Sequence, residues 1–368
     1  IKAYIWVMKR TKLNTSQMSF STYFVEQRST KTSVFYNQIN TLINWDKIDK
    51  VISRYYSKGN TLKGAKPYSG VLLFKMLLLG IWNDLSDEKT ENLVNDSLSA
   101  MRFCELSLED SVPDHSTLSR FRTELTKSNG MDKVLGAFNK QLEKHEVIIQ
   151  TGIKVDASLT DSLRKPKGDI RYSIAEDRKE DEVNEEEQKK QTAFLKKQQG
   201  KGVDTEGRWV KKGGHFHFGF KHHDAVDENG LVVAVHTTAA NQHDSKGLKP
   251  LLKKTPKRYK DKGVSADKGY KVPDNDRFLA KDKIKNRVMH KAYRNRPLTP
   301  WQVRFNKLIS KTRWVVERTF GSIKKWFGGG TARYMGLKKT HTQHVLQAIA
   351  YNLKRAPGII VSNSLKNA

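Results

Sequence analysis

The sequence predicts a mixed α+β protein, in which an all-helical N-terminal part precedes a part built from short strands and a long helix. Apolar residues recur at helical spacing from residue 20 to about residue 150. Short alternating or continuous apolar runs follow from residue 151, and the stretch 298–327 returns to helical spacing. We therefore expect a disordered or extended tail at 1–19, a helical domain at 20–150, a second domain at 151–356 with a charged insertion at 164–214, and a tail at 357–368.

The N-terminal part is expected to be a helical bundle. Apolar spacing predicts helices within 34–56, 64–82, 85–104 and 113–127. Ser86 can cap the third of these helices. The apolar run 71–82 is too short to span a membrane and contains Lys75, so we expect it to be a buried helix.

The fourth helix has two possible roles. Asp114 or Ser116 can cap it, and it would then present Ser119, Arg120 and Arg122 outward. Small polar residues with arginines near a helix start are typical of a helix-turn-helix that reads a DNA groove. An ordinary capped helix of a bundle would have the same sequence.

Strands dominate the next part. Periodicity predicts strands in 152–159, 215–227, 228–240, 263–267 and 286–293, and helices in 241–254 and 298–327. The turn Asn229-Gly230 predicts a hairpin. Alternation in its first strand places one set of side chains opposite another, namely Phe216, Phe218 and Phe220 against His215, His217, Lys221 and His223. The charged insertion is expected to be a mobile or partly helical surface segment.

Charge indicates a polyanionic partner. The net charge is +29 and the pI is about 9.9, which favours nucleic acid because phosphate neutralisation releases counterions. Ribosomal and membrane-surface proteins share this bias. The single cysteine, Cys104, excludes a disulfide framework and a cysteine-built zinc site, and fits a reducing cytoplasm. No secretory signal or membrane-spanning run is visible. Met8 followed by Lys-Arg is typical of a natural start, so residues 1–7 are either native or added sequence.

Three acidic residues stand at positions that a fold could bring together. Asp156 lies in the first strand, Asp267 ends a later strand, and Glu317 lies on the last predicted helix. If the two strands are neighbours, their carboxylates meet at one sheet edge. Three clustered carboxylates repel one another unless a cation neutralises them, and oxygen ligands suit Mg²⁺ or Mn²⁺. Two such ions would support in-line attack on a phosphodiester. Taken singly, these acids could be a strand-end cap, a turn and an exposed ion pair.

Several motifs in order carry a family resemblance. The N-terminal stretch "LSDEKTENLVNDSLSAMRFCELSLEDSVPDHSTLSRFR" is followed by "GIKVDAS", "HFHFGFKHHDAVDENGLV", "VSADKGY" and "RWVVERTFGSIKKWFGGGTARYMGL". The sequence resembles the DDE transposases of bacterial insertion sequences, in the InsH-like "insertion sequence five" group. The resemblance implies a ribonuclease-H-like catalytic domain at 151–356, a DNA-binding domain at 20–150, and a bacterial cytoplasmic, nucleoid-associated location. It also implies Asp156, Asp267 and Glu317 as catalytic and metal-binding residues, with two Mg²⁺ ions or Mn²⁺ as a substitute.

Basic residues near these acids are candidate DNA contacts. Arg313 and Lys324 fit the Tyr-Arg-Glu-Lys signature of related elements, although Ser310 stands at its tyrosine position. We expect both to hold phosphates, unless they only pair with surface acids. Further candidates for DNA contact are Lys221, Lys268, Arg318, Arg333 and Tyr334, together with Ser119, Arg120 and Arg122 of the fourth helix.

Two smaller questions stay open at this stage. The histidines of the hairpin could bind zinc, but a polar strand face is favoured because Lys221 lies among them. Asn241 and His243 could be helix caps or could line the cleft.

The sequence thus predicts a transposase that cuts the ends of an insertion element and transfers the 3′-hydroxyl into target DNA. Its partners would be the terminal inverted repeats and target duplex, bound by a homodimer, with no membrane. The alternatives are a metal-dependent nuclease of the same fold, an inactive domesticated copy that binds DNA, and an RNA-associated basic protein.

Overall fold

The protein was analysed as a computed structural model that describes residues 30–56, 67–166, 185–198 and 202–366. Seven helices form the described N-terminal part: α2 (Lys31–Leu42), α3 (Trp45–Ile52), α4 (Gly70–Trp82), α5 (Asp87–Asp96), α6 (Leu98–Phe103), α7 (His115–Lys127) and α8 (Gly130–Lys144). The change from helices to strands follows α8, where it was predicted. The expected tail 1–19 lies outside the described residues.

The predicted buried helix is confirmed in α4. Eleven of its thirteen residues are buried, and they include Lys75. The Lys75 ammonium lies 2.7 Å from Glu105 and 4.5 Å from the centre of the Trp45 ring, which compensates for its burial. In the part of the chain that is described, no helix combines the length and the apolar character needed to cross a membrane.

The second part is built on a seven-stranded mixed sheet, so the mixed α+β class is confirmed. Its strands are β1 (Ile153–Ser162), β2 (Arg208–Lys212), β3 (His215–Val226), β4 (Val232–Ala239), β5 (Val264–Ala266), β6 (Asn286–Val288) and β7 (Thr331–Ala332). The main path runs β2-β3-β1-β5-β6, and β4 pairs with β3 in the predicted hairpin. β3 is antiparallel to β1, β2 and β4, whereas β5 and β7 are parallel to β1.

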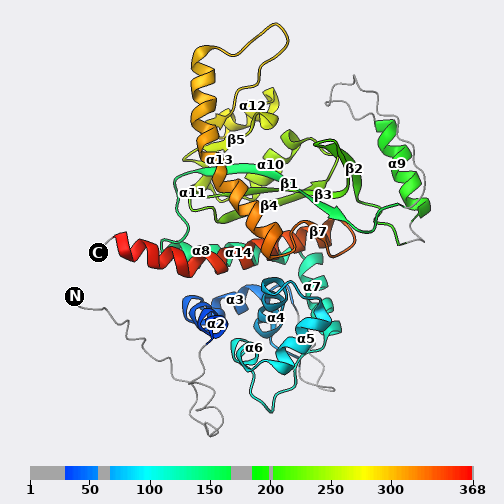
Figure 1. The fold of residues 1–368 in the computed structure, drawn as a ribbon, viewed down its shortest axis with the longest axis vertical. Helices are drawn as coiled ribbons and strands as arrows, with labels where there is room; N and C mark the ends of the chain where they lie inside the picture. Colours follow the sequence, from blue (N-terminus) through cyan, green and yellow to red (C-terminus); the bar gives the residue numbers. More distant parts are fainter. Residues whose placement is uncertain (1–29, 57–66, 167–184, 199–201, 367–368) are drawn as a thin grey trace.

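The helices of this part are α9 (Glu185–Gln198), α10 (Asp244–Lys254), α11 (Lys257–Lys260), α12 (Pro273–Lys281), α13 (Pro300–Trp326) and α14 (Leu337–Lys366), with a short 3₁₀ turn η2 (Lys268–Tyr270). Of these, α10 and α14 pack against β3 and β4, and α13 packs against β1. Figure 1 shows α14 and α8 between the sheet and the N-terminal helices, with α13 crossing the sheet. Most buried apolar side chains from α2 through α14 belong to one contiguous hydrophobic core, and Leu195, Val203 and Phe218 form a second, small cluster.

Three expectations about this part are corrected. Part of the predicted insertion, residues 208–212, is the strand β2. Helix α14 was not predicted, and it continues through Lys366, past residue 356 where the second domain was expected to end. Of the three phenylalanines predicted to share one side of β3, Phe218 and Phe220 are buried, whereas Phe216 near the start of the strand is 53% exposed. Residues 167–184 and 199–201 of the charged insertion lie outside the described part. The insertion is partly helical as expected, because it contains α9.

Candidate active site and nucleic-acid contacts

Asp156, Asp267 and Glu317 come together around Arg313, as the sequence predicted, but Asp156 lies within the central strand β1 and not at an edge of the sheet. β1 and β5 are parallel neighbours with Val155 opposite Ala266, so the next residue of each strand projects at the same level. Asp267 directly follows β5 and caps η2, where its Oδ1 accepts a hydrogen bond from the Lys268 amide at 2.6 Å. Glu317 approaches from α13, which packs against β1.

Arg313 is the centre of this cluster. One guanidinium nitrogen donates a hydrogen bond to Asp156 Oδ2 at 2.9 Å, and the other terminal nitrogen lies 3.4 Å from Asp267 Oδ1. Glu317, one helical turn further along α13, lies 3.7 Å from the same guanidinium. A single cation therefore joins three carboxylates from three different elements. This geometry excludes the interpretation of Arg313 and Glu317 as a simple surface pair.

The electrostatics of the site depend on burial and on Arg313. Burial raises the pKa of Asp156, although Arg313 and the amide of Ala157 act in the opposite direction. Burial alone would lower the pKa of Arg313, but Asp156, Asp267 and Glu317 raise it overall. The side chains of Asp156, Asp267 and Glu317 are 16%, 30% and 60% exposed, so the cluster opens to solvent on the side of α13.

The donor chemistry of the cluster fits a hard divalent cation. All three side chains offer carboxylate oxygens, which Mg²⁺ and Mn²⁺ prefer. Among the described residues, however, no group of three or more acidic, histidine or cysteine side chains is already spaced to hold a metal ion. The Arg313 guanidinium lies within 3.7 Å of all three carboxylates and supplies the neutralising charge.

Lys324 and Arg318 share α13 with the cluster but lie apart from it. Lys324 is two turns beyond Glu317, about 10 Å along the helix axis, and is exposed near Asp161 and Lys212. Arg318 donates a hydrogen bond to the Asn229 carbonyl at 2.9 Å and lies over the Trp314 ring. It therefore holds the β3–β4 turn against α13.

The Lys221 side chain is fixed by hydrogen bonds, whereas the Lys268 side chain is exposed. The Lys221 ammonium donates hydrogen bonds to the Gln242 carbonyl at 2.8 Å and to Asp244 at 2.7 Å, at the start of α10. Lys268 is exposed next to Asp267, and only its backbone amide contacts that carboxylate. His243 is a helix cap, since its Nδ1 accepts a hydrogen bond from the Ser245 amide.

Arg122 is not presented outward, so that expectation is wrong. It is 7% exposed, and its guanidinium makes a two-pronged contact with Asp87 of α5 at 2.7 and 2.8 Å. Its flat face lies 4.1 Å from the centre of the Tyr334 ring. Arg333 donates to the Leu85 carbonyl and pairs with Asp84. The loop that carries Arg333 and Tyr334 thus fastens the sheet to the N-terminal helices.

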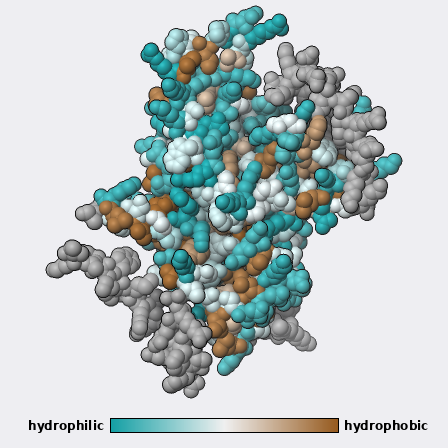
Figure 2. Space-filling model, in the orientation of Figure 1, coloured by the Kyte–Doolittle hydropathy of each residue, from teal (hydrophilic) through white to brown (hydrophobic). Residues whose placement is uncertain are grey.

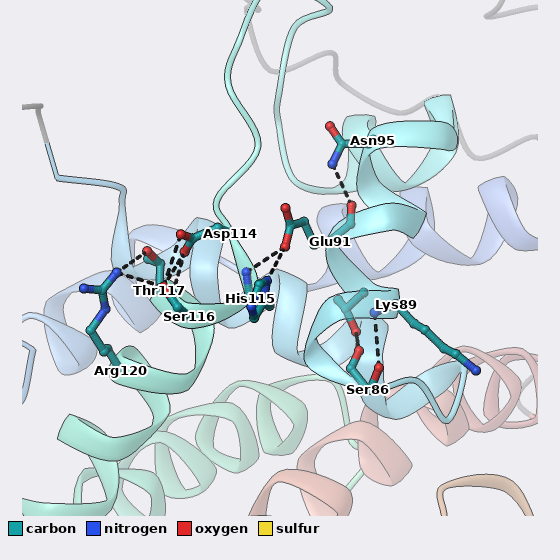
Figure 3. Close-up of polar contacts among 10 residues, drawn as sticks. Ser86, Lys89, Glu91, Asn95, Asp114, His115, Ser116, Thr117 and Arg120 are labelled. Atoms are coloured by element: carbon teal, nitrogen blue, oxygen red, sulfur yellow. Dashed lines mark hydrogen bonds and ion pairs between the residues drawn. The ribbon is translucent and has the colours of Figure 1, made fainter.

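Arg120 is an exposed cation near the start of α7, where it donates hydrogen bonds to the Ser116 and Thr117 hydroxyls. Figure 3 shows the Asp114 cap, the contact of His115 with Glu91, and Arg120 lying over Ser116 and Thr117. Arg120 is exposed, whereas Ser119 is half-buried. Of the three residues predicted to face DNA from this helix, Arg120 alone is fully accessible.

The hairpin histidines are not gathered for zinc. His217 contacts Asp161 at 2.9 Å, whereas His223 is completely buried under α10 and contacts the Tyr270 hydroxyl at 3.0 Å. His215 is exposed at the far end of β3.

A buried polar pair next to Asp156 was not predicted from the sequence. Asp224 is the cross-strand partner of Asp156, and it contacts His222 Nδ1 at 2.9 Å. His222 packs edge-on against Phe320 of α13. The signal was the run "HHD" directly before the apolar end of the strand, because histidine and aspartate are unusual among residues that a sheet buries.

Comparison with known proteins agrees with this geometry. Residues 141–353 match the family described as Transposase DDE domain, and residues 23–124 match Transposase domain (DUF772). Over 237 residues the chain is 34% identical to the transposase for insertion sequence element IS1106 of Neisseria meningitidis serogroup B, covering 64% of this chain and 76% of that protein. No solved structure matches the chain. The chain belongs to the DDE transposase family.

Proposed function

We propose that this transposase cleaves the DNA ends of its insertion sequence and joins the freed 3′-hydroxyl to target DNA, within a ribonuclease-H-like domain. The convergence of Asp156, Asp267 and Glu317 on Arg313 supports this proposal most strongly. The sheet supports it too, because antiparallel β4, β3 and β1 continue into the parallel strands β5 and β6.

The three carboxylates would hold divalent cations, for which Mg²⁺ is the proposed choice and Mn²⁺ the substitute, with two ions bound. When bound, such ions lower the pKa of an attacking water or hydroxyl and stabilise charge on the phosphate. Arg313 would leave the carboxylates and bind phosphate oxygens through its two-pronged guanidinium. Lys268, exposed beside Asp267, would contact the same phosphate as a point charge.

A strand-transfer assay tests the proposal. Duplexes that carry the element ends are incubated with supercoiled plasmid and Mg²⁺ or Mn²⁺, using wild type and Glu317→Gln. We expect metal-dependent joined products with wild type and at least a 100-fold loss in the variant, as is typical when a group that stabilises the transition state is removed. Glu109→Gln is the matched control, because Glu109 is exposed and lies in the N-terminal helical part, outside the carboxylate cluster.

Each other outcome supports a different function. Nicked plasmid without joined products would indicate a nuclease of the same fold. DNA binding without either product, equal in wild type and Glu317→Gln, would indicate a DNA-binding relic. Cutting both ends in concert would require a dimer, so we further propose two protomers per pair of end duplexes, a ratio that mass photometry of the complex measures.

A further inference from the structure

A basic projection lies at the start of α13, and nothing in the catalytic proposal uses it. We define the basic finger as residues 283–312, which comprise β6, the following loop and the first half of α13. Figure 1 shows the loop and the start of α13 extending beyond the sheet at the top of the view. At the same end, Figure 2 shows mostly hydrophilic surface around a small hydrophobic patch.

The finger concentrates uncompensated positive charge. Its thirty residues include no Asp or Glu and nine cations, namely Lys283, Lys285, Arg287, Lys291, Arg294, Arg296, Arg304, Lys307 and Lys311. All of them except Arg287, which is half-buried, are exposed. None of the nine lies within ion-pair distance of an acid in the described ranges of the chain. Unpaired cations repel one another and destabilise a monomer, so their clustering indicates an anionic partner.

The finger is built as an ordered structure. Tyr293 and Arg296 bond to each other through their backbones at 2.9 and 3.2 Å. Asn306 of α13 both accepts from and donates to the backbone of His290, at 2.8 and 2.9 Å. The His290 ring packs against Trp301 and Phe305, with centroids 5.5 and 5.2 Å apart. The backbone that carries the cations is therefore ordered before any partner binds.

The finger also exposes apolar surface that a monomer would normally bury. Tyr293 is 56% exposed and Trp301 is 63% exposed, although Trp301 belongs to the aromatic cluster that holds the finger together. Aromatic and basic side chains interleaved on one projection are typical of surfaces that bind the backbone of nucleic acids.

Helix α13 sets the distance from the finger to the carboxylates. Arg304 precedes Arg313 by nine residues of unbroken helix and Trp301 precedes it by twelve, which correspond to about 14 and 18 Å. One base pair rises about 3.4 Å along a duplex. A duplex with its cleaved phosphate at Arg313 would therefore pass the finger roughly four to five base pairs away.

We propose that the basic finger grips the sugar-phosphate backbone of the duplex about four to five base pairs from the cleaved phosphate, with Arg294, Arg296 and Arg304 as its phosphate contacts. This inference rests on the proposed function, because that function places the cleaved phosphate at Arg313. The duplex is either the element end or the target DNA, which share this chemistry.

Binding measurements without metal test the finger separately from catalysis. The variant replaces Arg294, Arg296 and Arg304 with glutamine. The control replaces the exposed residues Lys189, Lys190 and Lys197 of α9 with glutamine, which removes the same number of positive charges. Fluorescence anisotropy gives Kd for element-end duplexes that extend two or ten base pairs past the cleavage position on either side, and for target duplex without an element end.

We expect the finger variant to bind the ten-base-pair extension about 10- to 100-fold more weakly than wild type near ~0.1 M salt, and to reduce the slope of log Kd against log salt by about 2 to 3. The control and the two-base-pair duplexes should change by less than about 3-fold. Dependence on one side of the cleavage position assigns the element end, and loss on target duplex assigns target DNA.

Two results would overturn the inference. One is an equal loss in the finger variant and the α9 control, which would mean that only total charge matters. The other is unchanged DNA binding together with lost binding to vesicles of anionic lipid, which would make the finger a membrane contact. Circular dichroism establishes that each variant is folded. Failed strand transfer with intact finger-dependent binding would refute the catalytic proposal alone.

Discussion

The positive charge of Arg313 offsets the mutual repulsion of three carboxylates. Its guanidinium lies within 3.7 Å of Asp156, Asp267 and Glu317. It neutralises the same carboxylate charge that a divalent cation would neutralise. If these carboxylates bind divalent cations as proposed, metal and arginine would compete for them. DNA phosphate, by attracting the guanidinium away, would favour metal binding.

This competition predicts a gain of metal affinity on removal of the arginine. Arg313→Gln should bind Mn²⁺ more tightly than wild type without DNA, by about 10-fold if the lost competition amounts to roughly 1.4 kcal/mol. Titration calorimetry with Mn²⁺ measures this affinity. Lys311→Gln on the same helix is the control, since Lys311 is exposed and carries the same charge. Equal affinities in both variants would show that Arg313 does not compete with metal.

Thermal denaturation gives a second expectation for the same variant. Without metal, Arg313→Gln should unfold at a lower temperature than wild type, because three carboxylates lose their shared cation. Added Mn²⁺ should raise its melting temperature more than that of wild type, since a ligand stabilises the state that it binds. An equal rise in both proteins would contradict the expectation.

At the scale of elements, the contact between α10 and β3 fixes the buried face of the sheet behind the cluster. A methyl group on Gly247 of α10 would meet the His223 ring at 2.5 Å, closer than side chains can approach. His223 is completely buried and cannot turn out to solvent. The absence of a side chain at 247 is thus what lets the helix approach the strand.

Gly247→Ala should therefore destabilise the protein by roughly 1–3 kcal/mol through overpacking. Gly136→Ala is the control, because Gly136 lies in α8 with no atom near its would-be side chain. There the change should be neutral or stabilising by up to about 1 kcal/mol. Urea denaturation measures both, and equal effects of the two substitutions would refute this account of the contact.

Helix α7 forms as its sequence pattern predicts, but one of its arginines is not exposed as expected. The cap at Asp114 is present as predicted, yet Arg122 turns into the protein to meet Asp87. A helix has several faces, and the sequence does not state which one faces its neighbours when arginines lie on two of them. Removal of Asp87 would leave a buried guanidinium unpaired, so this contact stabilises the fold.

At the scale of the whole molecule, buried histidines make the fold sensitive to acid. Burial lowers the pKa of His223 to about 3 and that of His236 to about 4, and it lowers the pKa of His344 well below its usual value. An unfolded chain protonates its histidines near pH 6.5. The neutral form is therefore a requirement of the folded state.

The free energy of unfolding should be largest above pH 6.5 and should fall as the pH decreases from 6.5 towards 4, because the unfolded state then binds more protons. Each such histidine contributes a slope of roughly 1.4 kcal/mol per pH unit in that window. Asp227 acts in the opposite sense, since burial raises its pKa to about 6 and the folded state holds its proton. Urea denaturation at pH 7.5, 6, 5 and 4.5 measures the sum, and equal stability at every pH would contradict it.

The sequence was sufficient to predict the secondary structure that carries local signals. Caps at Ser86 and Asp114, the Asn229-Gly230 turn and the apolar stripe of α13 all stand within a few residues of the features they specify. Helix α14 was missed because it is buried on nearly every side and carries polar residues, such as Gln343, His344 and Asn352, that bond inside the core. A buried polar helix has no clean amphipathic stripe to detect.

The sequence by itself determined the mixed class, the order of elements and the identity of the three acids, because each follows from periodicity, local caps or motif order. Only the tertiary structure decided that Arg313 joins these acids, that Arg122 and Arg333 fasten the two parts of the chain, and that the finger's cations stay unpaired. These outcomes depend on distances between residues far apart in the chain. Such distances are set by how strands register and helices pack, which no local pattern encodes.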